Sequence, residues 1–411
     1  MITQKIFNDT ETAFKLKSDD ELNRALFLFG MINRPTLVKI GTALTKVSLR
    51  FRLPVEGLIR STIFNQFSGG ETMEECLPAI EKMYTKKLHS ILDYSVEGKE
   101  IEEHLDAAMN KKIKIIEFAA KRKEIPFAVF KPTGIGRLKI WEKVSSGEPL
   151  TVEEDGEWQR VKQRVKNICE AAYQNDISVL ADAEESWMQK AADDLMEEMM
   201  RKYNQEKVII FNTLQCYRWD RMTYLQDLHA KGKSEGFKIG AKIVRGAYME
   251  KENERAKKMG YPTPICENKE ATDVSYNGVL AYCLSNIDDI STFIGTHNEV
   301  SNYLALQIIE DKGIAIDDDR VWFSQLYGMS DHISYNLARK GYNSAKLLPF
   351  GPVRDVVPYL IRRAEENTSV KGQTGRELSL LLEEKKRRRG EVTKANREPG
   401  KIREKHREKV D

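Results

Sequence analysis

Charged side chains gather near the end of this chain in a pattern that could bind a small acid. In the stretch KLLPFGPVRDVVPYLIRRAEENTSV (346–370), Arg362 and Arg363 stand side by side, and Glu366 follows about one turn later. An arginine guanidinium matches a planar carboxylate through two parallel hydrogen bonds. A carboxylate clamp is therefore one interpretation of this pair, and an exposed basic helix face is the other.

Eight short apolar runs supply the elements that would position such residues. They are LHSILDYSV, PFAVFK, ISVLADAEE, KVIIFNTLQ, GAKIVRGAY, STFIGTHN, RVWFSQLYG and SAKLLPFG. Longer amphipathic segments separate the runs, which indicates a parallel sheet covered by helices. Eight such units in about 280 residues predict an α/β protein with a distorted (β/α)8 TIM-like barrel. An open doubly wound sheet is the competing architecture.

Polar residues recur where these predicted strands end. Barrel strands all point their carboxyl ends at one rim, where active sites lie. Edge solvation explains part of the pattern, but its recurrence after strand upon strand predicts a site at this rim. The residues are Asp93, Glu97, Lys131, Asp182, Glu184, Thr213, Gln215, Tyr217, Lys242, Arg245, Tyr248, Thr296, His297, Asn298 and Gln325.

The flanking segments differ from the barrel in texture. Apolar residues at helical spacing in 20–32, 35–51 and 56–67 predict an N-terminal helical arm. We expect three parts: the arm (1–84), the barrel with its site (85–370) and a basic tail (371–411). Residues 385–411 hold twelve Lys/Arg and five Asp/Glu, a net charge of +7. This tail is predicted to be flexible or a frayed helix, and either to touch an anionic membrane or simply to aid solubility.

Composition excludes several classes of protein. The 411 residues are 41% hydrophobic and 31% charged, which predicts a soluble globular chain. No apolar run is long enough to span a membrane, and the first residues do not resemble a signal peptide. Five scattered cysteines and six scattered histidines predict reduced, intracellular usage without a metal site. Because the total charge is +3 and the tail carries +7, the body is −4, which argues against nucleic-acid binding.

Several further strings follow one another along the chain: KPTGI, LADAEES, LQCY, KIVRGAY, KEATDVSYN, GTHN and PFGPVRDVVPYLIRRAEENTS. In this order they resemble the proline dehydrogenase family. The resemblance covers the chain to about residue 370. It implies noncovalent FAD, oxidation of L-proline to 1-pyrroline-5-carboxylate by hydride transfer to flavin N5, and electron transfer to a membrane quinone. It also implies a cytoplasmic protein peripheral to the inner membrane, or a mitochondrial one in a eukaryote. The chain is too short for a fused aldehyde dehydrogenase, so we expect a monofunctional enzyme of proline catabolism.

The resemblance also suggests roles for individual residues. Lys131, Arg362 and Arg363 would bind the proline carboxylate, and Lys242 would lie near flavin N5. Gly246 and Ala247 are small enough for backbone amides to approach phosphate or ribityl oxygens. The substrate side comprises Lys131, Asp182, Tyr248, Leu347, Tyr359, Arg362, Arg363 and Glu366. The FAD side comprises Gln215, Lys242, Val244, Gly246, Ala247, Tyr248, Thr296, His297, Asn298 and Gln325.

Some of these residues have other interpretations. Lys131 is also suited to a Schiff base in an aldolase or lyase on the same barrel. Asp182 would orient Lys131 or be structural, and Glu366 would brace the arginines or form an ordinary helix ion pair. Leu347 stands where the family often has a tyrosine over the substrate ring, which makes hydroxyproline or an N-alkylated analogue a further candidate. A flavin-free scaffold whose working part is the basic tail is the alternative outside enzymes.

Overall fold

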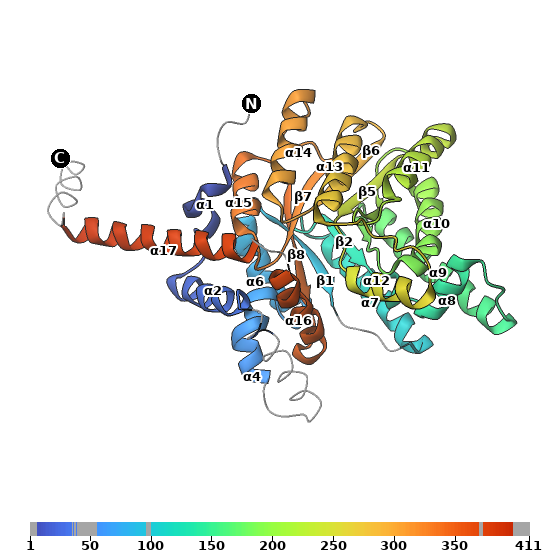
Figure 1. Ribbon diagram of the computed structural model, residues 1–411, viewed down its shortest axis with the longest axis horizontal. Coiled ribbons are helices and arrows are strands. Elements are labelled where there is room, and N and C mark those ends of the chain that lie inside the picture. Colours follow the sequence, from blue (N-terminus) through green and yellow to red (C-terminus); the bar gives the residue numbers. More distant parts are fainter. Residues whose placement is uncertain are drawn as a thin grey trace.

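A closed barrel of eight parallel strands forms the centre of the molecule (Figure 1). The computed structural model describes residues 6–34, 36, 38, 56–95, 100–369 and 373–397. The side chains of 56, 58, 362–369, 373–374 and 391–397 are outside this description. The strands are β1 (His89–Tyr94), β2 (Phe127–Phe130), β3 (Ser178–Ala181), β4 (Ile210–Gln215), β5 (Ile239–Val244), β6 (Ile290–Gly295), β7 (Val321–Leu326) and β8 (Ser344–Phe350). Six of them fall within the predicted apolar runs, and β5 and β6 each begin one residue before theirs. The barrel prediction is therefore confirmed and the open sheet is wrong.

Helices cover the outside of the barrel between consecutive strands. They are α7 (Glu102–Ala119), α8 (Leu138–Ser146), α9 (Val152–Gln174), α10 (Ser186–Tyr203), α11 (Arg221–Glu235), α12 (Met249–Met259), α13 (Lys269–Ser285), α14 (Glu299–Lys312), α15 (Asp331–Lys340) and α16 (Val353–Ser369). Their apolar faces and the outward side chains of the strands form one buried core.

The barrel closes where β1 pairs with β8, in a register that puts Ile91 opposite Leu347. Inside it, aromatic side chains pack edge to face, with the ring of Phe127 centred 5.2 Å from Phe293 and 5.1 Å from Trp322. These rings fill the lower interior, and the half-buried Leu347 packs against the same cluster. The packed interior leaves the strand ends as the place for a site.

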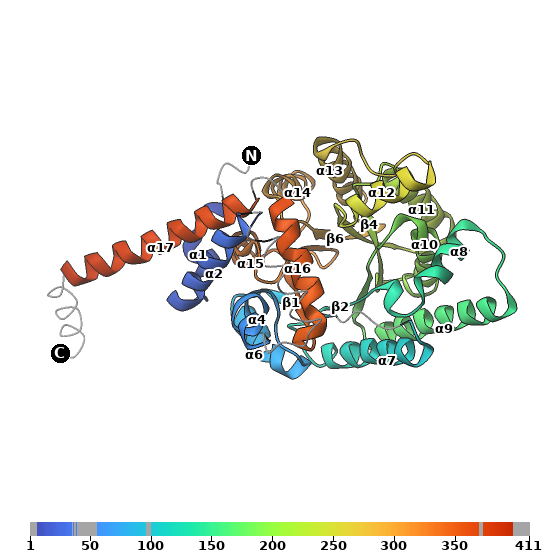
Figure 2. The ribbon, with the colours of Figure 1, turned by 60° about the horizontal axis from the view of Figure 1, so that its bottom comes forward.

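The N-terminal helices are α1 (Thr10–Phe14), α2 (Asp19–Ile32), α4 (Glu56–Ile59), a π-helical turn (Arg60–Phe64), α5 (Asn65–Phe67) and α6 (Met73–Tyr84). Thr72 accepts a hydrogen bond from the amide of Glu75 and so caps α6, as its position before that helix predicts. The predicted helix over 35–51 lies almost wholly outside the described residues. The arm shares a buried cluster with α16, which packs against α2 and α4 (Figure 2).

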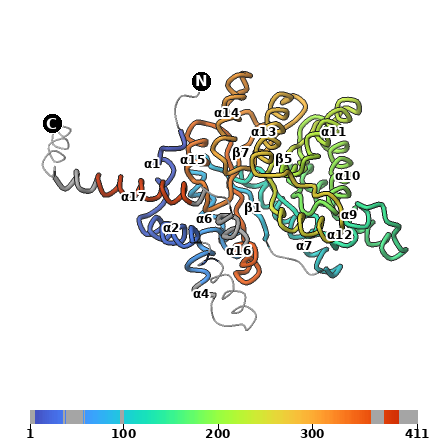
Figure 3. The backbone as a smooth tube through the Cα atoms, viewed as in Figure 1, coloured from blue at the N-terminus to red at the C-terminus, as the bar shows by residue number. Residues whose placement is uncertain are grey.

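The last helix, α17 (Gln373–Arg397), corrects the expectation of a flexible tail. Leu380, Leu381 and Glu384 are buried on it, and Arg388 binds Asp19 at 2.7 Å and the carbonyl of Phe14 at 2.9 Å. The helix lies beside α1 and α2, as the tube in Figure 3 shows. Leu380 and Leu381 supply the apolar surface by which this highly charged helix packs against the N-terminal helices. Residues 398–411 of the predicted tail lie outside the described residues.

In the described part of the chain, no helix is both long and apolar enough to cross a membrane.

Candidate functional site

Asp182 stands between two lysines at the strand ends. It follows β3, while Lys131 follows β2 and Lys242 lies on β5. Lys131 Nζ donates to Asp182 Oδ2 at 2.5 Å, and Lys242 Nζ donates to Asp182 Oδ1. The prediction that Asp182 orients Lys131 is supported by this contact. With one carboxylate between two ammoniums, the group keeps a net positive charge suited to an anionic ligand.

The pKa values of this group follow from the contacts. Burial opposes ionisation of Asp182, but Lys131 and Lys242 more than offset it, so the pKa of Asp182 lies below its usual range. Burial would likewise lower the pKa of Lys131, but Asp182 raises it well above the usual range, with Asp93 adding to the effect. Lys131 is therefore a protonated donor at neutral pH.

A second buried pair lies next to this group and was not predicted. Lys112 on α7 approaches Asp93 of β1 at 3.8 Å and donates to the carbonyl of Tyr94 at 3.4 Å. Burial, the largest influence, lowers the pKa of Lys112, and the positive charge of Lys131 adds to this effect. A lysine on an amphipathic helix predicts a solvated position, so nothing in the sequence singled out Lys112.

Glu184 and Gln215 join the loops that carry Lys131 and Asp182. The Glu184 carboxylate accepts from the amide of Thr133 at 2.9 Å and from its hydroxyl at 2.8 Å. Gln215 donates to the carbonyl of Glu184 at 2.6 Å. Burial raises the pKa of Glu184. The side-chain amide of Gln215, predicted to contact FAD, thus also holds the two loops together.

The VRGAY stretch after β5 presents a small, open backbone. Gly246 has φ +132°, a conformation that side chains rarely adopt, and a Cβ there would meet the ring of Tyr217 at 2.5 Å. Gly246 and Ala247 are exposed, whereas Val244 and Tyr248 are half-buried. Burial raises the pKa of Tyr248, so its phenol stays neutral. One side of Gly246 rests on the Tyr217 ring, and the exposure of Gly246 and Ala247 fits close approach by a phosphate or ribityl chain from solvent.

Arg245 ties this stretch to the loop after β6. Its guanidinium donates to Asp273 at 2.8 Å, to Thr296 Oγ1 at 2.7 Å and to Ser301 Oγ at 3.0 Å. Its carbon Cζ lies 4.4 Å from the ring centre of Tyr276. Arg245 is absent from the predicted FAD set, although it lies within the quoted VRGAY string.

The remaining predicted FAD residues cluster after β6 and β7. Thr296 Oγ1 also accepts from the amide of Asn298 at 3.1 Å, and Asn298 caps α14 by accepting from the amide of Ser301. Gln325 donates to the carbonyl of Thr296 at 3.0 Å. His297 is half-buried, and its Nδ1 lies 2.9 Å from Ser330 Oγ. The structure thus brings these four residues together, while their contact with FAD stays a prediction.

The substrate-side residues of the last unit are described only in part. Arg362, Arg363 and Glu366 belong to α16, but their side chains lie outside the described residues, so the clamp stays a prediction. Tyr359, on the same helix, is buried in the cluster shared with the N-terminal arm.

The fold and the charged group at its strand ends define a (βα)8-barrel protein with two lysines around one carboxylate at its rim. The family model for proline dehydrogenase matches residues 76–376. The chain therefore belongs to the proline dehydrogenase family of oxidoreductases.

Individual relatives show how far the similarity extends. The carbapenem antibiotics biosynthesis protein CarD of Pectobacterium carotovorum is 33% identical over 81% of this chain and 86% of its own. Hydroxyproline dehydrogenase of Xenopus laevis is 32% identical over 91% and 88%, respectively. Human mitochondrial proline dehydrogenase 1 is 40% identical over 59% of this chain, but only 41% of its own length is covered.

A solved structure supports the fold. Proline utilization A of Bdellovibrio bacteriovorus, inactivated by N-propargylglycine, superposes with a TM-score of 0.69 over 92% of this chain and 39% of its own. The identity is 21%, so this similarity concerns the fold alone.

Proposed function

We propose that the protein oxidises L-proline to 1-pyrroline-5-carboxylate with noncovalently bound FAD. The observation that carries the proposal is the buried Lys131–Asp182–Lys242 group at the strand ends of a chain in this family. Two carbons of the proline ring are bonded to the nitrogen. In this reaction the one that does not bear the carboxylate loses a hydride, and the nitrogen loses a proton. FAD would supply the hydride acceptor.

The chain's own side chains would bind and orient the reactants. Lys131, fixed by Asp182, would donate to the substrate carboxylate, with Arg362 and Arg363 as further donors. Lys242, held from the other side of Asp182, would place positive charge near flavin N5. Gly246 and Ala247 would let backbone approach the phosphates or ribityl chain, and Tyr248 would form a flat wall against the ligands.

The protonation of Lys131 argues against a Schiff-base lyase. A nucleophilic lysine needs a lowered pKa, which burial without a counter-charge provides. Here the Asp182 carboxylate raises the pKa of Lys131 instead. The geometry favours a charge partner over a covalent catalyst.

A visible spectrum of the purified protein, with and without L-proline under anaerobic conditions, tests the proposal. We expect a yellow protein whose flavin absorbance bleaches when L-proline is added. A colourless protein that FAD cannot reconstitute would overturn the assignment.

A 4-substituted proline is the second candidate substrate. Leu347 pairs in register with Ile91, packs against the aromatic cluster inside the barrel and carries no hydroxyl. Two relatives that this chain covers well are named for other roles. Comparing kcat/KM for L-proline and 4-hydroxyproline decides between them. If Leu347 leaves room for the substituent, Leu347→Tyr will lower kcat/KM for 4-hydroxyproline more than for proline.

Electron transfer to a membrane quinone, with peripheral contact at the membrane, completes the proposal. Lys385–Arg389 form a run of five basic residues on α17, away from the barrel rim. Each basic residue near an anionic membrane contributes about 1 kcal/mol to binding. Variants that neutralise this run would support the role if their turnover, relative to the wild-type protein, falls with a quinone analogue in vesicles but not with a soluble dye.

A further inference from the structure

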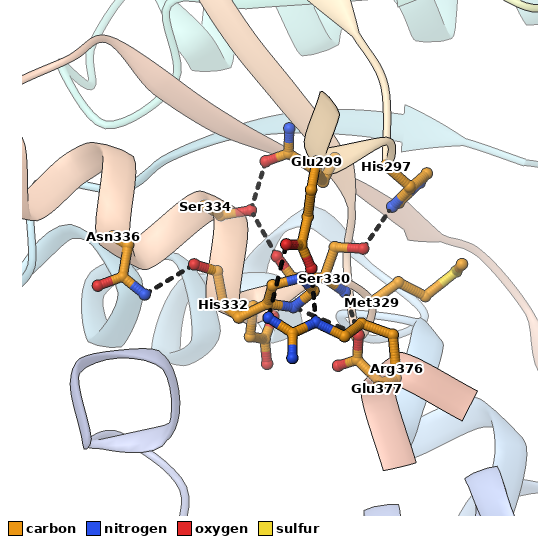
Figure 4. A network of polar contacts seen from close by, with 12 residues as sticks. His297, Glu299, Met329, Ser330, His332, Ser334, Asn336, Arg376 and Glu377 are labelled. Atoms are coloured by element: carbon orange, nitrogen blue, oxygen red, sulfur yellow. Dashed lines mark hydrogen bonds and ion pairs between the residues drawn. The ribbon is translucent and has the colours of Figure 1, made fainter. Parts of the chain in front are cut away.

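Two adjacent residues at the start of α17 reach the loops that carry the predicted FAD residues (Figure 4). Arg376 Nε donates to Glu299 Oε1 at 2.7 Å, next to the loop after β6. Glu377 Oε2 accepts from the amide of Ser330 at 3.1 Å, in the loop after β7. Glu377 is buried, with 5% of its surface exposed. The family match ends at residue 376, so Glu377 falls just beyond it.

Ser330 connects Glu377 to the site. Its hydroxyl lies 2.9 Å from His297 Nδ1, and the hydroxyl of Ser334, in the next turn, donates to Gln325 Oε1 at 2.6 Å. Ser330 has φ +50°, which is costly for a residue other than glycine and persists only where surrounding contacts hold it. Glu377 supplies one of these contacts by binding the Ser330 amide.

Charged groups around the turn make the arrangement rigid. Lys346 Nζ donates to the carbonyl of Met329 and pairs with Asp331 at 2.9 Å. His332 lies 3.1 Å from Glu299 and 3.7 Å from Glu377. Despite burial, hydrogen bonds from His332 and Arg376 lower the pKa of Glu299 to about 2. Glu299 is thus held by Arg376 and His332, while Glu377 is held by the amide of Ser330 with His332 beside it.

We propose that Glu377 is a positioning residue for the cofactor side of the site, acting through Ser330 on His297. This inference rests on the proposed FAD function. A glutamate that only anchored α17 to the barrel would affect stability but not the orientation of His297. The two roles differ in what happens to FAD affinity and to the His297 ring.

Variants of Glu377 separate these roles. Glu377→Ala should weaken FAD binding about tenfold, the size expected for one lost buried hydrogen bond. Glu377→Gln keeps an oxygen that accepts from the Ser330 amide, so it should restore FAD affinity to within about threefold. Glu383→Ala, at an exposed position on the same helix, is the matched control and should leave the affinity unchanged.

A double-mutant cycle tests the route through Ser330. Ser330→Gly removes the hydroxyl that contacts His297 but suits φ +50°, so it should weaken FAD binding without lowering Tm. In this background Glu377→Ala should lower Tm yet weaken FAD binding less than about twofold further. Effects on FAD affinity that simply multiply would overturn the proposal, as would an unchanged affinity in Glu377→Ala.

The flavin-free protein provides a readout that does not depend on FAD. The imidazole NMR signals of His297 can be assigned by their loss in His297→Gln. We expect Glu377→Ala, but not Glu383→Ala, to shift them. If Glu377→Ala shifts the His297 signals but the protein cannot be loaded with FAD, the positioning role stands and the proposed cofactor is rejected. Unshifted signals would reject the positioning role itself.

Discussion

Replacing Asp182 by asparagine is expected to destabilise the protein in a way that depends on pH. The carboxylate is the shared acceptor of Lys131 and Lys242, and the side chains of Asp182 and Lys242 are 14% and 9% exposed. Asparagine keeps the size and one acceptor oxygen but removes the charge. The variant therefore leaves two ammoniums facing each other without the carboxylate that they share.

The magnitude follows from the burial of the group. Removing one partner of a buried ion pair costs about 3–5 kcal/mol. We take the lower value, about 3 kcal/mol, because Lys131 is one-third exposed and asparagine still accepts a hydrogen bond. The unfolding entropy of a chain of this size is about 0.8 kcal/mol per kelvin, so Tm should fall by about 4 °C near pH 7.

The sign of the pH dependence distinguishes electrostatics from lost packing. A lowered Asp182 pKa and a raised Lys131 pKa mean that neither group titrates between pH 7 and 10 in the wild-type protein. Their pairing stabilises the fold in full above the unfolded pKa of aspartate and below the unfolded pKa of lysine, and the lysine contribution is lost as pH rises through its folded pKa. In the variant, repulsion lets one ammonium deprotonate more easily, so the Tm deficit should shrink as pH rises towards 10.

Asp193→Asn is the matched control for a Tm series from pH 7 to 10 by differential scanning fluorimetry. Asp193 is also buried, but its cation is Arg221, at 2.8 Å. An arginine keeps its proton throughout this range, so the Tm deficit of Asp193→Asn should stay constant. A deficit for Asp182→Asn that is equally constant, or absent at pH 7, would refute the electrostatic reasoning.

Four further outcomes are expected. Arg363→Ala should raise KM for proline and cost about 2–5 kcal/mol of transition-state binding, while FAD content stays near normal. Unchanged kinetics would reject the clamp. Borohydride with substrate should trap no adduct on Lys131, as peptide mass spectrometry can check, because this lysine stays protonated. Gly246→Ala should displace Tyr217 and lower stability by about 1–3 kcal/mol, measured by thermal unfolding. Removing residues 398–411, which carry a net charge of only +1, should leave co-sedimentation with anionic vesicles unchanged, whereas charge-neutralising variants within 385–389 should lower it, more so at low salt.

The barrel could be predicted from sequence because each strand is buried on both faces. Segments such as Ile239–Val244 and Val321–Leu326 are nearly continuous apolar runs, and only a covered parallel sheet accommodates eight of them. Lys131, Asp182 and Lys242 could then be assigned to one rim, because the carboxyl ends of all strands in a parallel barrel lie on the same side. The family motifs added roles that strand pattern cannot supply.

The network behind the rim could not be predicted, because its members come from distant and ordinary-looking positions. Lys112 and Glu377 lie on charged helices whose composition indicates solvent exposure. Yet the Lys112 side chain is only 12% exposed beside Asp93 of β1, and Glu377 is buried against the loop after β7, far away in the sequence. For the same reason the charge of 385–411 predicted a disordered segment or a frayed helix, whereas its described part, up to Arg397, continues a helix anchored by the buried Leu380 and Leu381. Tertiary contacts outweighed local composition at each of these positions.

The joining of both chain ends has a consequence for how the protein is made. The barrel cannot close until β8, at residues 344–350, pairs with β1, and the loops around His297 and Ser330 lack their last support until α17 has been synthesised and docked. During translation the first seven strands would therefore wait with an unpaired β1 edge, a stage at which aggregation and chaperone binding compete with folding. On this order of events, the rim acquires its final shape only after α17 has been synthesised and has docked, so cofactor uptake would be a late step of folding.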